Sequence, residues 1–76
     1  MTIGEFMKIS SFNYGELCFW IMRDNDYITK TSLTLEEMED KLYRNDNIMN
    51  YEITEVYFAY GTCLDEGYLE VYFYIK

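Results

Sequence analysis

Residues 51–76 read YEITEVYFAYGTCLDEGYLEVYFYIK, so two runs rich in Tyr, Phe, Val and Ile lie on either side of a short polar segment. Aromatic and β-branched residues favour strands, and a glycine in a short connection between two strands is typical of a hairpin loop. The sequence therefore predicts a long hairpin with arms at 51–63 and 68–75 and a turn at 65–67.

The side chains of this hairpin divide between two faces, because successive residues of a strand point to opposite sides. If Leu64 pairs with Tyr68, one face is apolar and the other is mostly tyrosine. The apolar face holds Ala59, Gly61, Cys63, Leu69, Val71, Phe73 and Ile75. The tyrosine-rich face holds Phe58, Tyr60, Thr62, Tyr68, Glu70, Tyr72 and Tyr74. We expect a helix on the apolar face, where Ala59 and Gly61 leave room for it.

A helix is predicted before the hairpin, over residues 35–44. Thr34 and Glu37 have the spacing of a capping box, in which each side chain accepts a hydrogen bond from the other residue's amide. Met38 and Leu42 then continue an apolar stripe that suits one buried helix face.

The first third of the chain predicts strands at 5–12, 16–23 and 27–31, and the second of these is apolar almost throughout. We therefore expect an α+β fold for residues 1–76 as a single compact domain. Its antiparallel sheet would have four or five strands with one helix packed on one face, in the order ββ(β)αββ.

The composition excludes several classes of function. The chain has 14 Asp and Glu against 6 Lys and Arg, a net charge of −8, and no His. The negative charge argues against direct binding to nucleic-acid phosphates, which need a basic surface. Without His, an imidazole base and the common zinc sites that use His are impossible. No nucleophile elbow, phosphate loop or calcium loop is present, so we expect a protein that is not an enzyme and needs no cofactor or metal.

The expected compartment is the cytoplasm. No basic N-terminal region precedes a long apolar run, and the apolar runs are too short to cross a membrane. Two cysteines, Cys18 and Cys63, lie in apolar stretches and are expected to be buried reduced thiols.

The negative charge is concentrated in residues 34–76, which carry −7 against −1 for residues 1–33. Such a charge can simply keep a small protein soluble, or it can steer the chain to a basic partner. For the second case we predict a partner-binding surface made of carboxylates and outer tyrosines. Its members are Glu36, Glu37, Glu39, Asp40, Glu52, Glu55, Glu70, Tyr60, Tyr72 and Tyr74.

In length, charge, α+β outline and tyrosine content the chain resembles the small acidic proteins that phages and other mobile elements use against host defences, including anti-CRISPR proteins and DNA mimics. The resemblance implies an inhibitor that binds a basic nucleic-acid-handling protein, such as a nuclease complex, and occludes its channel. It assigns no role to any residue. Two alternatives stay open: a homodimeric assembly protein that uses the tyrosine-rich face, and an antitoxin-like regulatory subunit.

Overall fold

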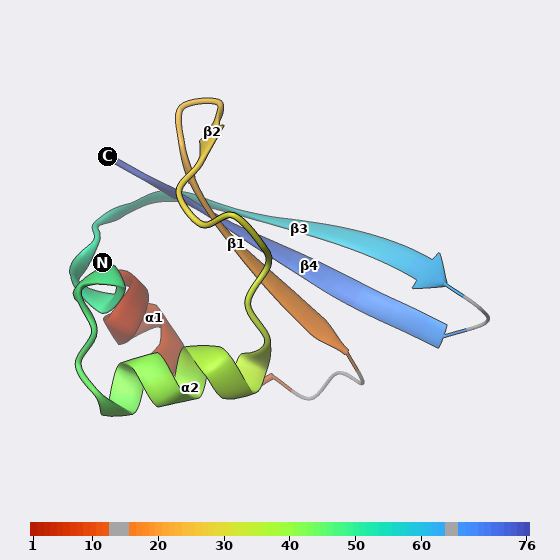
Figure 1. The fold of residues 1–76 in the computed structure, drawn as a ribbon, viewed down its shortest axis with the longest axis horizontal. Helices are drawn as coiled ribbons and strands as arrows, with labels where there is room; N and C mark the ends of the chain where they lie inside the picture. Colours follow the sequence, from red (N-terminus) through yellow and green to blue (C-terminus); the bar gives the residue numbers. More distant parts are fainter. Residues whose placement is uncertain (13–15, 64–65) are drawn as a thin grey trace.

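The computed structural model describes residues 1–12, 16–63 and 66–76, with the side chains of 61–67 excepted. Two helices and one mixed sheet make an α+β fold (Figure 1). The elements are α1 (Ile3–Ile9), β1 (Leu17–Arg23), β2 (Asp26–Tyr27), α2 (Leu35–Tyr43), the 3₁₀ helix η1 (Asn47–Asn50), β3 (Ile53–Cys63) and β4 (Glu66–Ile75).

The strands lie in the order β2-β1-β4-β3, so the C-terminal strand is interior (Figure 1). β4 runs antiparallel to β3 but parallel to β1, from the pair Leu17–Leu69 to the pair Met22–Tyr74. The prediction of an antiparallel sheet is therefore only partly right. Both interior strands carry bulky apolar or aromatic residues on both faces, which is typical of strands that have neighbours on each side.

The N-terminal segment is a helix, and the prediction of a strand over 5–12 is wrong. A capping box begins α1: the Glu5 amide donates to Thr2 Oγ1 over 3.1 Å, and the Thr2 amide donates to Glu5 Oε1 over 2.9 Å. Ile3 and Met7 are one helical turn apart and are both buried. The spacing of Thr2 and Glu5 was the sequence signal for this helix.

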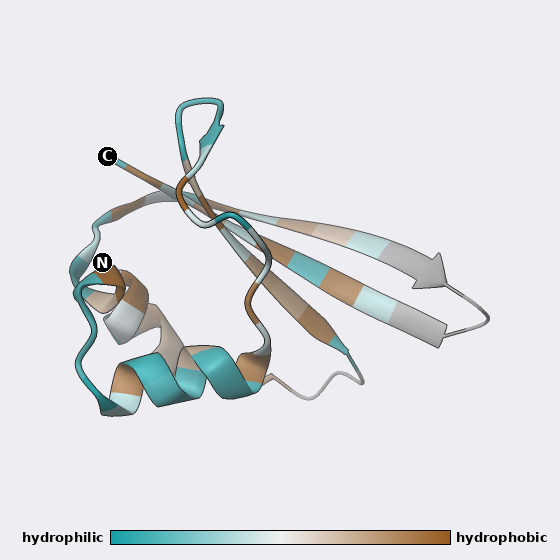
Figure 2. Cartoon of the chain, viewed as in Figure 1, coloured by the Kyte–Doolittle hydropathy of each residue, from teal (hydrophilic) through white to brown (hydrophobic). Residues whose placement is uncertain are grey.

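Helix α2 confirms the helix predicted over 35–44 to within one residue at its end. The Glu37 amide donates to Thr34 Oγ1 over 3.1 Å and the Thr34 amide donates to Glu37 Oε1 over 3.0 Å, as the capping box requires. Met38 is fully buried, whereas Figure 2 shows much of α2 as hydrophilic. The strand predicted at 27–31 is wrong in extent, because β2 has only two residues.

The hairpin of β3 and β4 forms, but in a register three residues away from the predicted one. Gly61 pairs with Tyr68, and Ala59 pairs with Glu70 instead of Phe73. Leu64, on which the predicted register rested, lies outside the described residues, as does Asp65 of the predicted turn.

The odd shift moves the side chains of β3 to the opposite face from the predicted one, because the side-chain period of a strand is two. Phe58 pairs with Val71 and so lies on the face that the helices cover, whereas Ala59 lies on the other face. The two faces predicted for β4 are correct, since Val71 and Phe73 are fully buried and Tyr72 is not.

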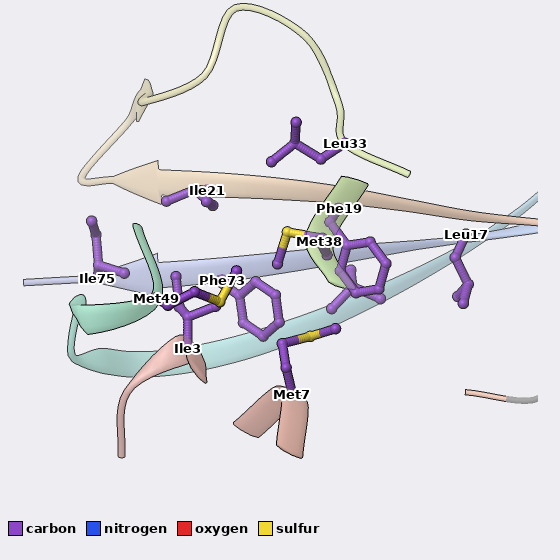
Figure 3. Packing of buried hydrophobic residues seen from close by; sticks show 11 residues of the cluster. Ile3, Met7, Leu17, Phe19, Ile21, Leu33, Met38, Met49, Phe73 and Ile75 are labelled. Carbon is purple, nitrogen blue, oxygen red and sulfur yellow. The ribbon is translucent and has the colours of Figure 1, made fainter. Parts of the chain in front are cut away.

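The core lies between the sheet and the helices. Phe19 of β1 and Phe73 of β4 stack with ring centroids 6.0 Å apart and ring planes 10° from parallel. Met7 of α1 and Met38 of α2 lie around these rings (Figure 3). The buried apolar residues are Ile3, Met7, Leu17, Phe19, Ile21, Met22, Leu33, Met38, Met49, Val71, Phe73 and Ile75. Except for Met22, they form one cluster on the helix side of the sheet.

We expect Met38→Ala to lower the free energy of unfolding by about 2–5 kcal/mol, because truncation of a buried methionine leaves a cavity. Tyr43→Ala, on the same helix but 91% exposed, should change it by less than about 0.5 kcal/mol. Urea unfolding followed by circular dichroism measures both. Equal losses in the two variants would contradict the packing described for α2.

Candidate functional site

The face of the sheet opposite the helices carries a line of aromatic side chains, which we call the aromatic row: Tyr27, Trp20, Tyr72 and Tyr57. Ring centroids lie 5.0 Å apart from Tyr27 to Trp20, 6.3 Å from Trp20 to Tyr72, and 6.1 Å from Tyr72 to Tyr57. The row crosses all four strands. Trp20 and Tyr72 are half-buried, whereas Tyr27 and Tyr57 are 56% and 54% exposed.

The alternation of side chains that builds the core also determines where the aromatic row lies. Trp20 lies between the buried residues Phe19 and Ile21, so it must point to the other face of β1. The register then places Tyr72 beside both Trp20 and Tyr57. The planes of the Trp20 and Tyr72 rings are 12° from parallel, as neighbouring side chains on a sheet allow.

One carboxylate lies on each side of the aromatic row. Glu70 is two residues before Tyr72 on the same face, and its Oε2 accepts a hydrogen bond from the Tyr72 hydroxyl over 2.8 Å. Glu55 pairs with Tyr74, on the other side of the row, and is exposed. A row of aromatic rings with carboxylates beside it suits a positively charged group, which rings attract through their faces and carboxylates through their charge.

The Tyr72 hydroxyl is held in its protonated form. Burial raises the pKa of Tyr72 to about 12, and the hydrogen bond to Glu70 and the negative charge of Glu70 act in the same direction. Tyr72 therefore remains a donor throughout the neutral range and fixes the orientation of the Glu70 carboxylate.

The acids of α2 lie on the helix side of the sheet and do not join the aromatic row. All four are exposed. Glu37 is used in the capping box and Asp40 forms an ion pair of 3.2 Å with Arg44. The side chains of Glu36 and Glu39 form no ion pair or hydrogen bond with any residue that the structure describes. The predicted binding surface is thus divided into two surfaces on opposite sides of the molecule.

Of the three predicted residues still to be placed, Glu52 and Tyr60 are also separated from the aromatic row, and Tyr74 is not. Glu52 Oε2 is bound to the N-terminal ammonium group over 3.0 Å. Tyr60 pairs with Leu69 and so lies on the helix face of β3, where it is 67% exposed. Tyr74 does lie on the outer face, between Met22 and Glu55 in register.

Trp20, Tyr27 and Tyr57 belong to the row but were not among the predicted site residues. By alternation, the wrong hairpin register puts Tyr57 on the same face as Ala59, which is the face predicted to be apolar. The alternation of Phe19, Trp20 and Ile21 in a strand next to β4 was the signal for Trp20.

Other kinds of site find little support in the described part of the chain. No group of three or more His, Cys, Asp or Glu residues there could hold a metal ion. Cys18 is a free thiol that is half-buried rather than fully buried on the outer face, and the side chain of Cys63 lies outside the description. No helix among the described residues is long and apolar enough to cross a membrane.

Because the folded state holds Tyr72 protonated, the unfolded chain loses this proton first, near the ordinary tyrosine pKa of about 10. The stability that depends on Tyr72 is therefore complete below pH 10 and is lost as the pH rises to about 12. Urea unfolding across this range should show a smaller loss in Tyr72→Phe than in the wild type. An equal loss in both would contradict the raised pKa of Tyr72.

No protein-family model, no curated protein and no solved structure matches this chain. The resemblance to small acidic anti-defence proteins therefore stays a prediction.

Proposed function

We propose that this protein is a non-enzymatic inhibitor that docks on a basic surface of a nucleic-acid-handling protein. The observation that carries the proposal is the aromatic row with Glu70 and Glu55 beside it, on a sheet face that no described helix covers, in a chain of net charge −8. An anti-CRISPR-type inhibitor of a nuclease complex is the most concrete form, and that form rests on the resemblance alone.

The chemistry of the row favours Arg and Lys side chains of a partner. A cation over the face of Trp or Tyr gains about 0.5–2 kcal/mol, depending on how far it is desolvated. The Glu70 carboxylate, already oriented by Tyr72, adds a charge-assisted partner for a guanidinium group. Tyrosine and tryptophan are also the residues that most often carry the binding energy of protein interfaces.

Nucleic acid is a poorer fit for the same surface. Aromatic platforms do stack unpaired bases, but they do so beside a positively charged groove that follows the backbone. Here the charges beside the row are Glu70 and Glu55. Arg23 lies at the end of β1, where its Nε donates to the Lys76 carbonyl oxygen over 2.8 Å.

The acids of α2 would act at a distance rather than in the contact. They lie on the helix side of the sheet, yet their field adds to the attraction between the chain and a basic partner. Charges outside the interface mainly raise the association rate, and salt screens this effect over about 8 Å at physiological ionic strength. The aromatic row would instead set the dissociation rate.

We expect Tyr57→Ala to weaken partner binding by about tenfold or more, which is the effect of losing one interface residue worth about 1.4 kcal/mol. Tyr43→Ala, which removes an equally large and more exposed tyrosine on the helix side, should leave binding unchanged. The partner is first captured from a nuclease-treated lysate and purified. Biolayer interferometry then gives the affinity of each variant, and displacement of labelled DNA or RNA from the partner tests the inhibition.

The proposal fails if the captured partner does not bind nucleic acid, if the chain does not displace it, or if Tyr57→Ala binds as tightly as Tyr43→Ala.

The double variant Glu36→Lys and Glu39→Lys should slow association several-fold with little change in the dissociation rate. These two acids are chosen because neither holds a helix cap or an ion pair, so that the fold is preserved. The difference from the wild type should shrink as the salt concentration rises. A large change in the dissociation rate would instead show that α2 contacts the partner. It would contradict the proposal that the aromatic row alone forms the contact.

A further inference from the structure

The sheet has two edges, and the fold closes only one of them within the described residues. Beside β1, the Phe19 amide donates to the Leu33 carbonyl over 2.7 Å and the Leu33 amide donates to the Phe19 carbonyl over 2.8 Å. On the same side, the Ile28 amide donates to the Ile21 carbonyl over 2.8 Å. The other edge is β3, the longest strand, and no described strand lies beyond it in the order of the sheet.

The direction of the backbone groups of β3 follows from its neighbour. The Leu69 amide donates to the Glu16 carbonyl over 3.0 Å, so the amides and carbonyls of Leu69 and Val71 face β1. Leu69 and Val71 therefore form no backbone hydrogen bonds with the β3 residues opposite them. It follows that the amides and carbonyls of Phe58, opposite Val71, and of Val56, two residues earlier, point outward from the sheet.

The start of this edge is already occupied. The Ile53 amide donates to the Met1 carbonyl over 2.9 Å, and Thr2 forms an isolated bridge with Glu52. An irregularity in the register between Ile53 and Glu55 separates this part from the rest of the strand. Among the described residues, the part of the edge from residue 55 to residue 59 therefore has no neighbouring strand.

We propose that this open edge pairs antiparallel with the same edge of a second copy of the chain, about a twofold axis, so that two four-stranded sheets become one sheet of eight strands. A second copy fits because each described chain has one such edge, and antiparallel pairing of identical strands closes the assembly at two chains. Pairing satisfies the outward amides and carbonyls of both copies together.

The charges of the strand allow pairing with itself. Glu55 is the one charged residue between Ile53 and Cys63. In antiparallel registers centred on Phe58 or Ala59, Glu55 faces position 61 or 63 of the second copy, both uncharged. The two carboxylates thus lie at opposite ends of the pairing. The strand also lacks the lysines and prolines that commonly protect a sheet edge from association.

Exposed aromatic side chains lie where the second copy would pack. Phe58 is 50% exposed on the helix face of the edge, and Tyr57 is 54% exposed on the outer face. Pairing would bury part of each against the partner strand. It would also bring the two aromatic rows into one continuous outer face, since Tyr57 is the end of the row nearest this edge.

Each chain carries a net charge of −8, so the two copies repel each other, and screening by salt should strengthen the association. In sedimentation equilibrium, the average mass should rise from the 9.2 kDa of one chain toward twice that value as the concentration increases from about 1 to about 300 µM. The dissociation constant should fall severalfold when NaCl is raised from about 50 mM to about 500 mM.

Amide hydrogen exchange of the wild-type protein identifies the surface used. The Phe58 amide should become protected as the concentration rises, whereas the Tyr57 amide, which faces β4, should be protected at every concentration. Phe58→Pro removes the outward amide and should weaken association at least tenfold, and Phe58→Ala, which keeps that amide, should weaken it less. Circular dichroism shows whether each variant is folded.

The proposal is overturned if the wild type stays monomeric at the highest concentration and salt. It is also overturned if a dimer forms while the Phe58 amide exchanges equally fast at both ends of the concentration range. The second result would place the contact on another surface of the chain.

Discussion

The parallel pairing of β1 with β4 is the constraint on which the rest of this structure depends. It aligns Phe19 with Val71 and Ile21 with Phe73, so one face of two interior strands becomes a continuous apolar surface. A parallel pair needs a connection of a dozen residues or more, because the chain must return to the end of the sheet at which it began. That connection contains α2, which packs Met38 onto this surface, and α1 packs Met7 beside it.

The same pairing generates the surface on which function is proposed. In a strand, each residue that enters the core directs its neighbours to the opposite face, so the order Phe19-Trp20-Ile21 and the order Val71-Tyr72-Phe73 specify core and aromatic row together. The two central members of the row, Trp20 and Tyr72, are therefore held by the interior strands whose other face forms the core. Half-burial of Trp20 and Tyr72 in a packed line limits their rotamers before any partner arrives, which lowers the entropy lost on binding.

Local signals in the sequence predicted the parts of this fold that local interactions determine. The capping box at Thr34 and Glu37 predicted α2 to within a residue, and the alternation in β4 predicted which of its side chains are buried. The helix α1 had an equally local signal, the box of Thr2 and Glu5, but the apolar residues around it also fit a strand. A segment of this length is ambiguous on periodicity alone.

The parts that sequence could not give depend on contacts between distant residues. β4 follows β1 by more than forty residues, so no local pattern predicts that the two strands pair or that the pair is parallel. The hairpin register was missed by three residues, and an odd error exchanges the two faces of β3. For this reason Tyr57 was absent from the predicted site and Tyr60 was included in it.

Some acidic side chains cap helices and others are exposed without such a role, but all of them contribute to the net charge of −8. Glu5, Glu37 and Asp46 accept hydrogen bonds from backbone amides at helix starts, and these bonds lower the pKa of Glu5 and Asp46. A capping carboxylate keeps its charge, so it still contributes to the long-range field while its position is fixed by the helix. A broad negative field of this kind would attract basic molecules without selecting among them. Selection requires a surface with a defined shape, and in the proposed function the aromatic row supplies it.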